Sequence, residues 1–513
     1  MAITTEKLET SAASTSATPP SAPPAVPQPS TLLPALGLGL LSGVLVILAY
    51  PPFNAWPLAF VAFVPMIVGQ HRVAPPRWSG AVFGVGIGVM LAGALSIGLY
   101  QDRVAPVFQL LPVFMAVIFA VAMRRSRRFH ERTGYRWLWI TTPLAWVAVD
   151  FGRTLGALSA LGGTFANPVY TLFPIKTFLQ PISVFGMYGL ELLLLVINYA
   201  IATAIIRRLD GKPLPTRLLA GVLAAAVAWT LLGAALMGSG GRTVRVAAIQ
   251  TGTDGYHGDA QMEARLQRDI AQTKAAAAQG AKLAVWSEGG LPYDPTTSHT
   301  AELQALARDN NIAVSIGYGY DDAKHRHHNE VRLLTPDGKF SEPYGKDHPG
   351  TFAGDYSDTG GTYPVTRTSF GAIGTVICYD MDFTDTARKM TRNGARLIAA
   401  SSSDVFAIAD THYTHLIFRA IENRVATVKG DKGYDSAVID PWGRVRTLTT
   451  NPSGHGQRTL VANVPLGSGK SPYISLGDWM GWLALLGTAG VIVAAKVTAR
   501  RRTSDDAESP SAA

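Results

Sequence analysis

The sequence predicts two parts of different fold class, a multi-pass α-helical membrane domain and an α/β domain of layered strands and helices. Of the 513 residues, 48% are hydrophobic and only 16% are charged, whereas roughly 25% are charged in soluble domains. Long apolar runs fill the first half and recur once near the end, while the acidic residues and short β-rich runs concentrate in residues 238–476. A freely soluble enzyme and a disordered chain are therefore both disfavoured.

Eight apolar runs approach the ~20 residues that a helix needs to cross the hydrocarbon core. Buried helices of a soluble protein would explain one such run but not eight. The sixth run contains Pro181 and two glycines, so it is expected either to kink or to begin as an interfacial segment. The runs are 32–50, 56–69, 79–100, 105–123, 137–151, 177–206, 217–237 and 478–497.

Basic residues outnumber acidic ones by 45 to 36, and their positions favour a membrane protein over a nucleic-acid-binding one. They gather between or after the apolar runs, and eight spans put all the clusters on one side, which is the cytoplasm by the positive-inside rule. Both termini would then be cytoplasmic and residues 238–476 extracytoplasmic. The clusters occupy residues 71–77, 124–136, 207–217 and 496–502.

The first 30 residues are rich in Ser, Ala and Pro and read as a disordered cytoplasmic tail without a signal-peptide pattern. The segment after the seventh run alternates strand and helix signals, which is typical of a layered α/β domain. Helices are expected at 259–279, 301–310, 385–393 and 413–428. The predicted divisions are a tail at 1–30, a transmembrane domain of about seven helices at 31–237, an extracytoplasmic domain at 242–472, a transmembrane helix at 477–498 and a cytoplasmic tail at 499–513.

Cys378 is the chain's one cysteine, so neither an intramolecular disulfide nor a cysteine-rich metal site is expected. It follows the apolar run 372–377 and precedes a polar, helical stretch. A thiol at a strand-to-helix turn lies near main-chain N–H groups, which lower its pKa and favour the thiolate nucleophile. A buried structural thiol is the alternative.

Two further segments end predicted strands or hairpins with charged side chains. Glu288 follows the run 283–287, and Lys346 lies after the hairpin-like segment 330–339. Taken singly, each is also explained as an ordinary surface charge. His348, His412 and His415 suggest a metal site only weakly, because no acidic third ligand is fixed by the spacing; no metal is expected.

These segments stand in an order that resembles the nitrilase superfamily: a strand then Glu288, Tyr344-x-Lys346-x-His348, and a strand then Cys378-Tyr379. The resemblance implies an αββα sandwich that carries a Glu–Lys–Cys triad, and it makes 242–472 the catalytic domain. Cys378 would be the nucleophile, Glu288 the general base, and Lys346 the oxyanion stabiliser together with the main-chain N–H of Tyr379. Further matching segments are Val246-Ala247-Ala248-Ile249-Gln250, Arg419-Ala420-x-Glu422-Asn423 and Ser436-x-x-x-Asp440-Pro441-x-Gly443.

A nitrilase-like domain inserted between the seventh and eighth of eight spans resembles the apolipoprotein N-acyltransferase family. The resemblance implies a bacterial cytoplasmic-membrane enzyme with a phospholipid acyl donor, a diacylated apolipoprotein acceptor, no cofactor and no nucleic-acid partner. Because both substrates keep their acyl chains in the bilayer, the site should face the membrane. Leu291, Tyr293, Phe352 and Tyr356 are candidate lining residues.

Two positions depart from the family pattern. Asp355 stands where a supporting glutamate is usual, and Cys378-Tyr379-Asp380 replaces Cys-Tyr-Glu. Asp355 is a candidate for the supporting role, and Asp380 either acts at the site or caps the following helix. Two other functions stay open: a membrane-tethered hydrolase with water or a small amine as acceptor, and a non-catalytic partner of a membrane complex.

Overall fold

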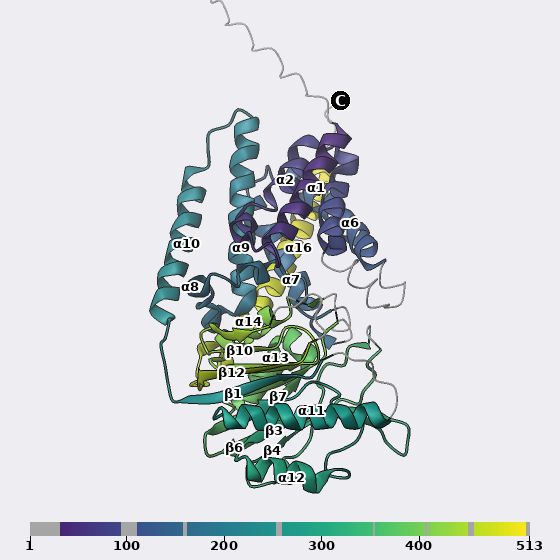
Figure 1. Cartoon of the computed structure of the whole chain (residues 1–513). Helices are drawn as coiled ribbons and strands as arrows, with labels where there is room; N and C mark the ends of the chain where they lie inside the picture. Colours follow the sequence, from purple (N-terminus) through teal and green to yellow (C-terminus); the bar gives the residue numbers. More distant parts are fainter. Residues whose placement is uncertain are drawn as a thin grey trace, which may run out of the picture.

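A computed structural model describes residues 31–93, 110–156, 162–252, 259–351, 354–405, 408–409, 411–449 and 456–508. It has two parts: a bundle of helices and, below it in Figure 1, a sandwich of two sheets with helices on both outer faces. The chain enters the sandwich after α10 and leaves it into α16. The predicted tail at 1–30 lies outside the described residues, as does part of the run 79–100 and of the run 105–123.

Long helices form most of the bundle, and within the described residues four are long and apolar enough to cross a membrane by length and composition: α1, α9, α10 and residues 479–497 of α16. The helix α7 is apolar but shorter. The principal helices of the bundle are α1 (Leu32–Ala49), α3 (Ser79–Leu91), α6 (Leu111–Arg132), α7 (Leu138–Gly152), α9 (Ile182–Leu209), α10 (Thr216–Leu236) and α16 (Trp479–Glu508).

The prediction of a continuous span at 56–69 is wrong. This stretch contains the short helices η1 (Trp56–Phe60) and α2 (Val64–Val68), and a π turn, η2 (Gly69–Val73), follows it. Pro57 and Pro65 each stand in a first helical turn, where proline is tolerated because its missing N–H has no partner there. Apolar composition alone does not reveal such breaks.

The predicted kink in the sixth run is confirmed. After the single turn of α8 (Lys176–Leu179), α9 is interrupted at Gly186, whose φ of 64° and ψ of 176° are not helical. This backbone conformation is essentially open only to glycine. The interruption frees the main-chain N–H of the next residue, Met187, for a partner outside the helix.

Three of the basic clusters meet at the end of the bundle that points away from the sheets (Figure 1). Arg127 donates to the main-chain oxygens of Gln70, at 2.5 Å, and Ala74, at 2.8 Å. Arg72 pairs with Asp210, after α9, at 2.8 Å. Contacts between these three clusters therefore place them at one end of the bundle.

The second half is an αββα sandwich. Sheet A has the order β12-β1-β2-β3-β4-β5 and sheet B the order β11-β10-β9-β8-β7-β6. The strands of sheet A are β1 (Thr243–Gln250), β2 (Leu283–Val285), β3 (Ala313–Asp321), β4 (His327–Leu334), β5 (Tyr344–Gly345) and β12 (Arg458–Pro465). Those of sheet B are β6 (Val365–Thr368), β7 (Gly371–Ile377), β8 (Leu397–Ser402), β9 (Ala426–Asp431), β10 (Ala437–Ile439) and β11 (Val445–Leu448).

Apolar residues between the sheets form one core, which includes Val246 and Val285 of sheet A and Ile373, Ala399 and Val428 of sheet B. The helices α11 (Asp259–Ala278) and α12 (Thr300–Asp309) cover sheet A. The helices α13 (Thr384–Arg392) and α14 (Tyr413–Asn423) cover sheet B on the side of the bundle. Burial of these apolar faces on both sides of each sheet is what holds the four layers together.

The helix expected at 413–428 ends earlier. Arg424 takes the left-handed conformation, with a φ of 51°, and closes α14 after Asn423. The buried strand β9 follows at once and pairs in parallel with β8. This difference matters for the site, because β9 brings Lys429 and Asp431 into the interior.

Candidate active site

The carboxyl ends of the central strands bring the predicted residues together. In sheet A, β1, β2 and β3 are parallel, and Glu288 follows β2. In sheet B, β7, β8 and β9 are parallel, and Cys378 follows β7 directly. The main-chain N–H of Glu288 donates to the oxygen of Ser402, at the end of β8, at 3.2 Å. This bond joins the two sheets at the edge where the chemistry is expected.

Lys346 lies between two carboxylates. Its Nζ is 2.7 Å from Glu288 Oε1 and 2.8 Å from Asp355 Oδ2, and its side chain is only 5% exposed. Burial alone would lower the pKa of Lys346, but Glu288, Cys378 and Asp355 together raise it well above its usual value. Lys346 therefore carries a fixed positive charge suited to stabilising an oxyanion.

Asp355 reaches the lysine in spite of its shorter side chain. Its second oxygen accepts the main-chain N–H of Ser357 at 3.0 Å. Although burial would raise it, Lys346 lowers the pKa of Asp355 to about 2. Asn329 Nδ2 donates to both acids, to Glu288 Oε1 at 2.7 Å and to Asp355 Oδ2 at 3.2 Å. Asn329 is a site residue that sequence reasoning missed, and nothing in its local sequence marks it.

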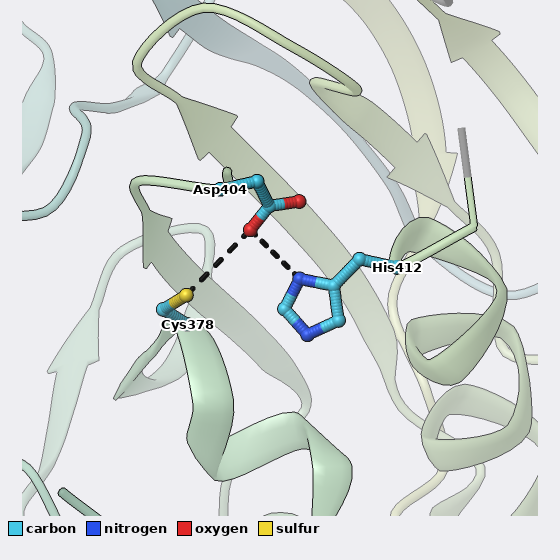
Figure 2. Close-up of side chains that lie close together, drawn as sticks. All are labelled: Cys378, Asp404 and His412. Atoms are coloured by element: carbon cyan, nitrogen blue, oxygen red, sulfur yellow. Dashed lines mark hydrogen bonds and ion pairs between the residues drawn. The ribbon is translucent and has the colours of Figure 1, made fainter. Parts of the chain in front are cut away.

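Cys378 is the first residue of a short 3₁₀ turn, η8 (Cys378–Asp382), and has a φ of 41°. A non-glycine residue in this region is strained, and such strain is concentrated at functional sites. The thiol is buried and donates to Asp404 Oδ1 at 3.6 Å (Figure 2). The turn thus aims the sulfur into the polar edge between the sheets.

The expected lowering of the cysteine pKa is wrong. Burial, the Glu288 carboxylate and the Asp404 carboxylate raise the pKa of Cys378 well above its usual value, and Lys346 opposes them only in part. The sequence suggested an electropositive setting for the thiol. Instead, the turn is short, and the carboxylates of Glu288 and Asp404 lie near the sulfur. At rest Cys378 is a thiol, so a role as nucleophile would require a base.

Asp380 joins the turn η8 to the segment that carries Lys346. It accepts the main-chain N–H groups of Ile377, Asp347 and His348 at 2.9, 3.1 and 2.9 Å. The Tyr344 hydroxyl donates to it at 2.6 Å. Burial raises the pKa of Asp380 to about 6, against the lowering effect of His348. These contacts favour an anchoring role over the direct role that the sequence left open.

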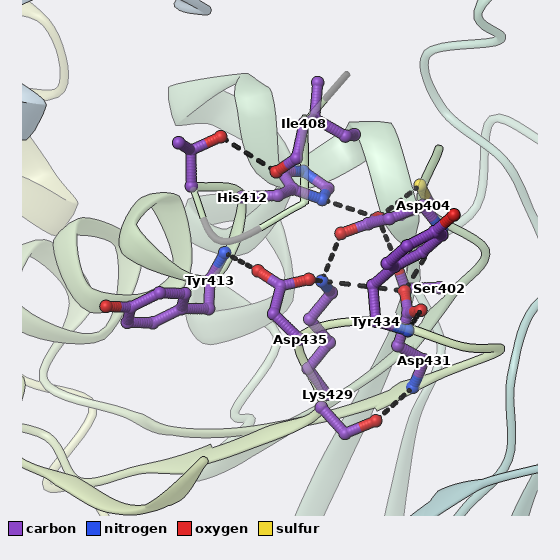
Figure 3. Close-up of polar contacts among 12 residues, drawn as sticks. Ser402, Asp404, Ile408, His412, Tyr413, Lys429, Asp431, Tyr434 and Asp435 are labelled. Atoms are coloured by element: carbon purple, nitrogen blue, oxygen red, sulfur yellow. Dashed lines mark hydrogen bonds and ion pairs between the residues drawn. The ribbon is translucent and has the colours of Figure 1, made fainter. Parts of the chain in front are cut away.

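A buried charged network lies behind Cys378 and was not predicted. His412 contacts Asp404 Oδ1 through Nδ1 and Asp382 Oδ2 through Nε2, each at 2.8 Å. Burial would lower the pKa of His412, but Asp404 and Asp382 raise it to about 10. Lys429 contacts Asp404 and Asp435 (Figure 3). The imidazole and the ammonium are both charged, and both are neutralised by aspartates.

A signal for part of this network was present in the sequence. Asp404 follows the run 397–401 just as Glu288 and Cys378 follow theirs, so the same strand-end argument would have found it. Asp382 lies 2.8 Å from both His412 and His415, and it is the acidic third group that their spacing did not reveal. These three side chains lie close enough together to hold a metal ion. However, each carboxylate oxygen of Asp382 already contacts one of the two imidazoles.

The four candidate lining residues lie in different surroundings. Leu291 is buried in the core between sheet A and its helices and bridges to Tyr318, so its prediction as a lining residue is wrong. Tyr293 is partly buried and stacks on His299 at 5.6 Å between ring centroids. Tyr356 is exposed. Phe352 lies outside the described residues.

Comparison with known proteins gives two family models in chain order: the apolipoprotein N-acyltransferase N-terminal domain at residues 42–200 and carbon-nitrogen hydrolase at residues 245–471. The apolipoprotein N-acyltransferase of Geobacter metallireducens is 26% identical over 517 residues, covering 91% of this chain and 95% of its own.

Two amidases cover smaller shares of the chain. An (R)-stereoselective amidase from Pseudomonas sp. is 30% identical over 178 residues, 32% of this chain and 62% of its own. The crystal structure of an amidase from Nesterenkonia sp. is 20% identical, covers 45% of this chain and 93% of its own, and gives a TM-score of 0.38. With both domain models in order and a relative aligned over nearly the full length, the chain belongs to the apolipoprotein N-acyltransferase family, a membrane branch of the carbon-nitrogen hydrolases.

Proposed function

We propose that the protein transfers an acyl chain from a phospholipid to the α-amino group of the N-terminal diacylglyceryl-cysteine of apolipoproteins, through a thioester on Cys378. The observation that carries the proposal is the Glu288–Lys346 pair, 2.7 Å apart, on the strand edge that also presents Cys378. A charged lysine and a carboxylate beside a thiol are the groups that acyl transfer through cysteine needs.

In the first half-reaction, the Cys378 sulfur attacks the ester carbonyl and its proton passes to Glu288. The carbonyl oxygen becomes an oxyanion, stabilised by Lys346 and the main-chain N–H of Tyr379. When the intermediate collapses, the C–O bond breaks and the leaving oxygen of the lyso-phospholipid takes the proton from Glu288. The enzyme then carries an acyl thioester, and Glu288 is a carboxylate again.

In the second half-reaction, the neutral α-amine of the lipoprotein attacks the thioester carbonyl. The new amide bond forms, the C–S bond breaks, and the amine proton passes through Glu288 to the sulfur. Protons and charges balance over the cycle, so no cofactor is required by this scheme. Asp355, bonded to Lys346 at 2.8 Å, would hold the lysine in place through both steps.

The protein is a membrane protein, and we infer its orientation from the basic clusters. The clusters gather at the end of the bundle opposite the sandwich. By the positive-inside rule the catalytic domain at 242–472 is extracytoplasmic. The transmembrane domain at 31–237, the helix at 477–498, and cytoplasmic tails at 1–30 and 499–513 complete the proposed division. A site beside the bundle suits substrates whose acyl chains stay in the bilayer.

The test is acyl transfer by the purified chain in liposomes that contain a phospholipid with one isotopically marked acyl chain. The acceptor is a synthetic diacylated lipopeptide with a free cysteine amine, and mass spectrometry reads both peptide and protein. A peptide heavier by one marked chain, lost in Cys378→Ala, is the expected result. Glu288→Gln should form no acyl-enzyme while keeping the fold.

The products also separate the alternatives. A marked acyl group that accumulates on Cys378 and leaves only as free fatty acid would replace the transferase by the membrane-tethered hydrolase. Transfer that persists in Cys378→Ala would overturn the thioester mechanism. An inert protein, under conditions in which a known acyltransferase works, would favour the non-catalytic partner.

A further inference from the structure

The sulfur of Cys378 faces a second carboxylate besides Glu288. Asp404 Oδ1 lies 3.6 Å from Cys378 Sγ and accepts its hydrogen bond (Figure 2). Asp404 comes just after β8, the strand parallel to the one that carries the nucleophile. It touches the reacting atom, yet the reaction scheme above gives it no role.

Asp404 is rigidly held and fully buried. Its Oδ1 also accepts from Ser402 Oγ at 2.7 Å and from His412 Nδ1 at 2.8 Å. Its other oxygen contacts the ammonium of Lys429, and its main-chain N–H donates to Asp431 Oδ2 at 3.1 Å. Burial would raise the pKa of Asp404, but the charges of His412 and Lys429 hold it well below its usual value. It can therefore accept a hydrogen bond from the thiol but cannot take its proton.

The support of Asp404 reaches the membrane domain. His412 is fixed on its far side by Asp382 at 2.8 Å. The main-chain oxygen of Asp382 accepts both the N–H and the hydroxyl of Thr164, at 2.9 and 2.6 Å. Thr164 belongs to the segment between α7 and α9. The acceptor of the thiol hydrogen bond is thus fixed relative to the bundle as well as to the sandwich.

We propose that Asp404 is a guard carboxylate: it holds the Cys378 sulfur as a thiol between turnovers, and the sulfur is released to Glu288 only when the donor ester binds. A negative charge against the sulfur disfavours the thiolate. The thiolate is the form that oxidants and adventitious electrophiles attack. Activation of the nucleophile would then depend on substrate. The inference rests on the proposed function, in which Cys378 is the nucleophile.

The groups that face the sulfur define the expected pH behaviour. Glu288 and Asp404 oppose ionisation of Cys378, and Lys346 favours it. His412 and Lys429 face Asp404 and neutralise part of its charge. Removing the Asp404 charge should therefore ease ionisation of the thiol, whereas removing the His412 charge should hinder it.

The test uses the single cysteine of the full-length protein. Alkylation by iodoacetamide in detergent reports on Cys378 alone, and its rate against pH gives the apparent pKa of the thiol. In Asp404→Asn the midpoint should fall by about one unit or more. Each unit by which the pKa falls increases the fraction of thiolate at pH 7 but lowers the nucleophilicity of that thiolate. The net result should be alkylation about threefold faster per unit. Asp385→Asn, which removes a carboxylate paired with His348 and Lys389 instead, should leave the midpoint unchanged.

A second variant guards against misfolding as an explanation. His412→Gln should move the midpoint upward, opposite to Asp404→Asn, whereas loosening of the site would move both variants the same way. A midpoint that stays or rises in Asp404→Asn would overturn the guard role. Failure of the proposed function is seen separately, as acyl transfer that survives in Cys378→Ala, because alkylation does not depend on catalysis.

Discussion

The main-chain N–H of Met187, in the membrane bundle, donates a 2.9 Å hydrogen bond to Glu422 Oε1, on the sandwich helix α14. The bond exists because α9 is broken at Gly186, which frees that N–H from the helix. Glu422 also pairs with Arg419 at 2.8 Å, and both side chains are fully buried. The kink of the membrane helix and the docking of the catalytic domain are therefore one structural feature.

Replacing Glu422 by alanine should destabilise the protein by about 3–5 kcal/mol, because the buried Arg419 charge would lose its partner. Thermal unfolding in detergent, followed by tryptophan fluorescence, measures the loss. Glu302→Ala is the matched control, since Glu302 is exposed and a surface change should stay within about 0.5 kcal/mol. Equal unfolding temperatures for the two variants would contradict the docking role.

Gly186→Ala should also destabilise the joint between the domains. The residue has a φ of 64°, and an added Cβ would lie 2.7 Å from a ring carbon of Tyr473. Strain and overlap together should cost about 1–3 kcal/mol. In Gly221→Ala, within α10, the Cβ meets no atom within 4 Å, so the helix should gain up to about 1 kcal/mol. Unfolding temperatures that shift in the same direction would refute this account.

The sequence predicts the strands around the site because local patterns decide where each strand ends. The apolar runs that became β2, β7 and β8 each end in polar residues, and parallel strands bring those ends to one edge. This logic predicts Glu288 and Cys378 in their observed places. The motif around Lys346 adds the third group, although its strand, β5, has only two residues.

Other parts of the site depend on contacts that the sequence does not display. Lys429 and Asp431 read as surface charges, and only the ion pairs made after folding allow β9 to be buried. Burial and Glu288 raise the pKa of Cys378, and so does Asp404, which is 26 residues away in the chain. By contrast, Pro57 and Pro65 stand in the sequence itself, and they mark the breaks in the run 56–69.

Asp355→Asn should reduce acyl-enzyme formation by roughly 10-fold to 100-fold, because Lys346 would lose one of the two carboxylates that fix it and a misplaced group costs about this much. The effect should fall on kcat with little change in KM, since Asp355 holds the lysine rather than the substrate. Asp355→Glu should recover part of the rate. Single-turnover labelling of Cys378 by a marked phospholipid measures the rate of acyl-enzyme formation.

The control for this prediction lies in the same segment. Asp358 pairs with Arg326 at 3.3 Å and is half exposed, at 51%, so Asp358→Asn should keep the rate within about twofold. A rise in KM alone in Asp355→Asn would instead assign Asp355 to substrate binding. An unchanged kcat would mean that Glu288 alone is enough to position Lys346.

The charge on His412 should make stability depend on pH. Burial would lower the pKa of His412, but Asp404 and Asp382 raise it to about 10 in the folded protein, against about 6.5 in an unfolded chain. The folded state therefore holds a proton that the unfolded state releases. This stabilisation is complete below pH 6.5 and is lost as pH rises through 10. It should amount to about 5 kcal/mol at its maximum.

Unfolding temperatures of the protein and of His412→Gln, measured from pH 6 to pH 10, isolate this contribution. The variant should be less stable at pH 6, and the difference should shrink steadily towards pH 10. His327→Gln, at an exposed histidine paired with Asp321, is the control and should follow the unaltered protein across the range. A difference that grows with pH would mean that His412 is buried as the neutral imidazole, and the charged network behind Cys378 would then need a different assignment of its protons.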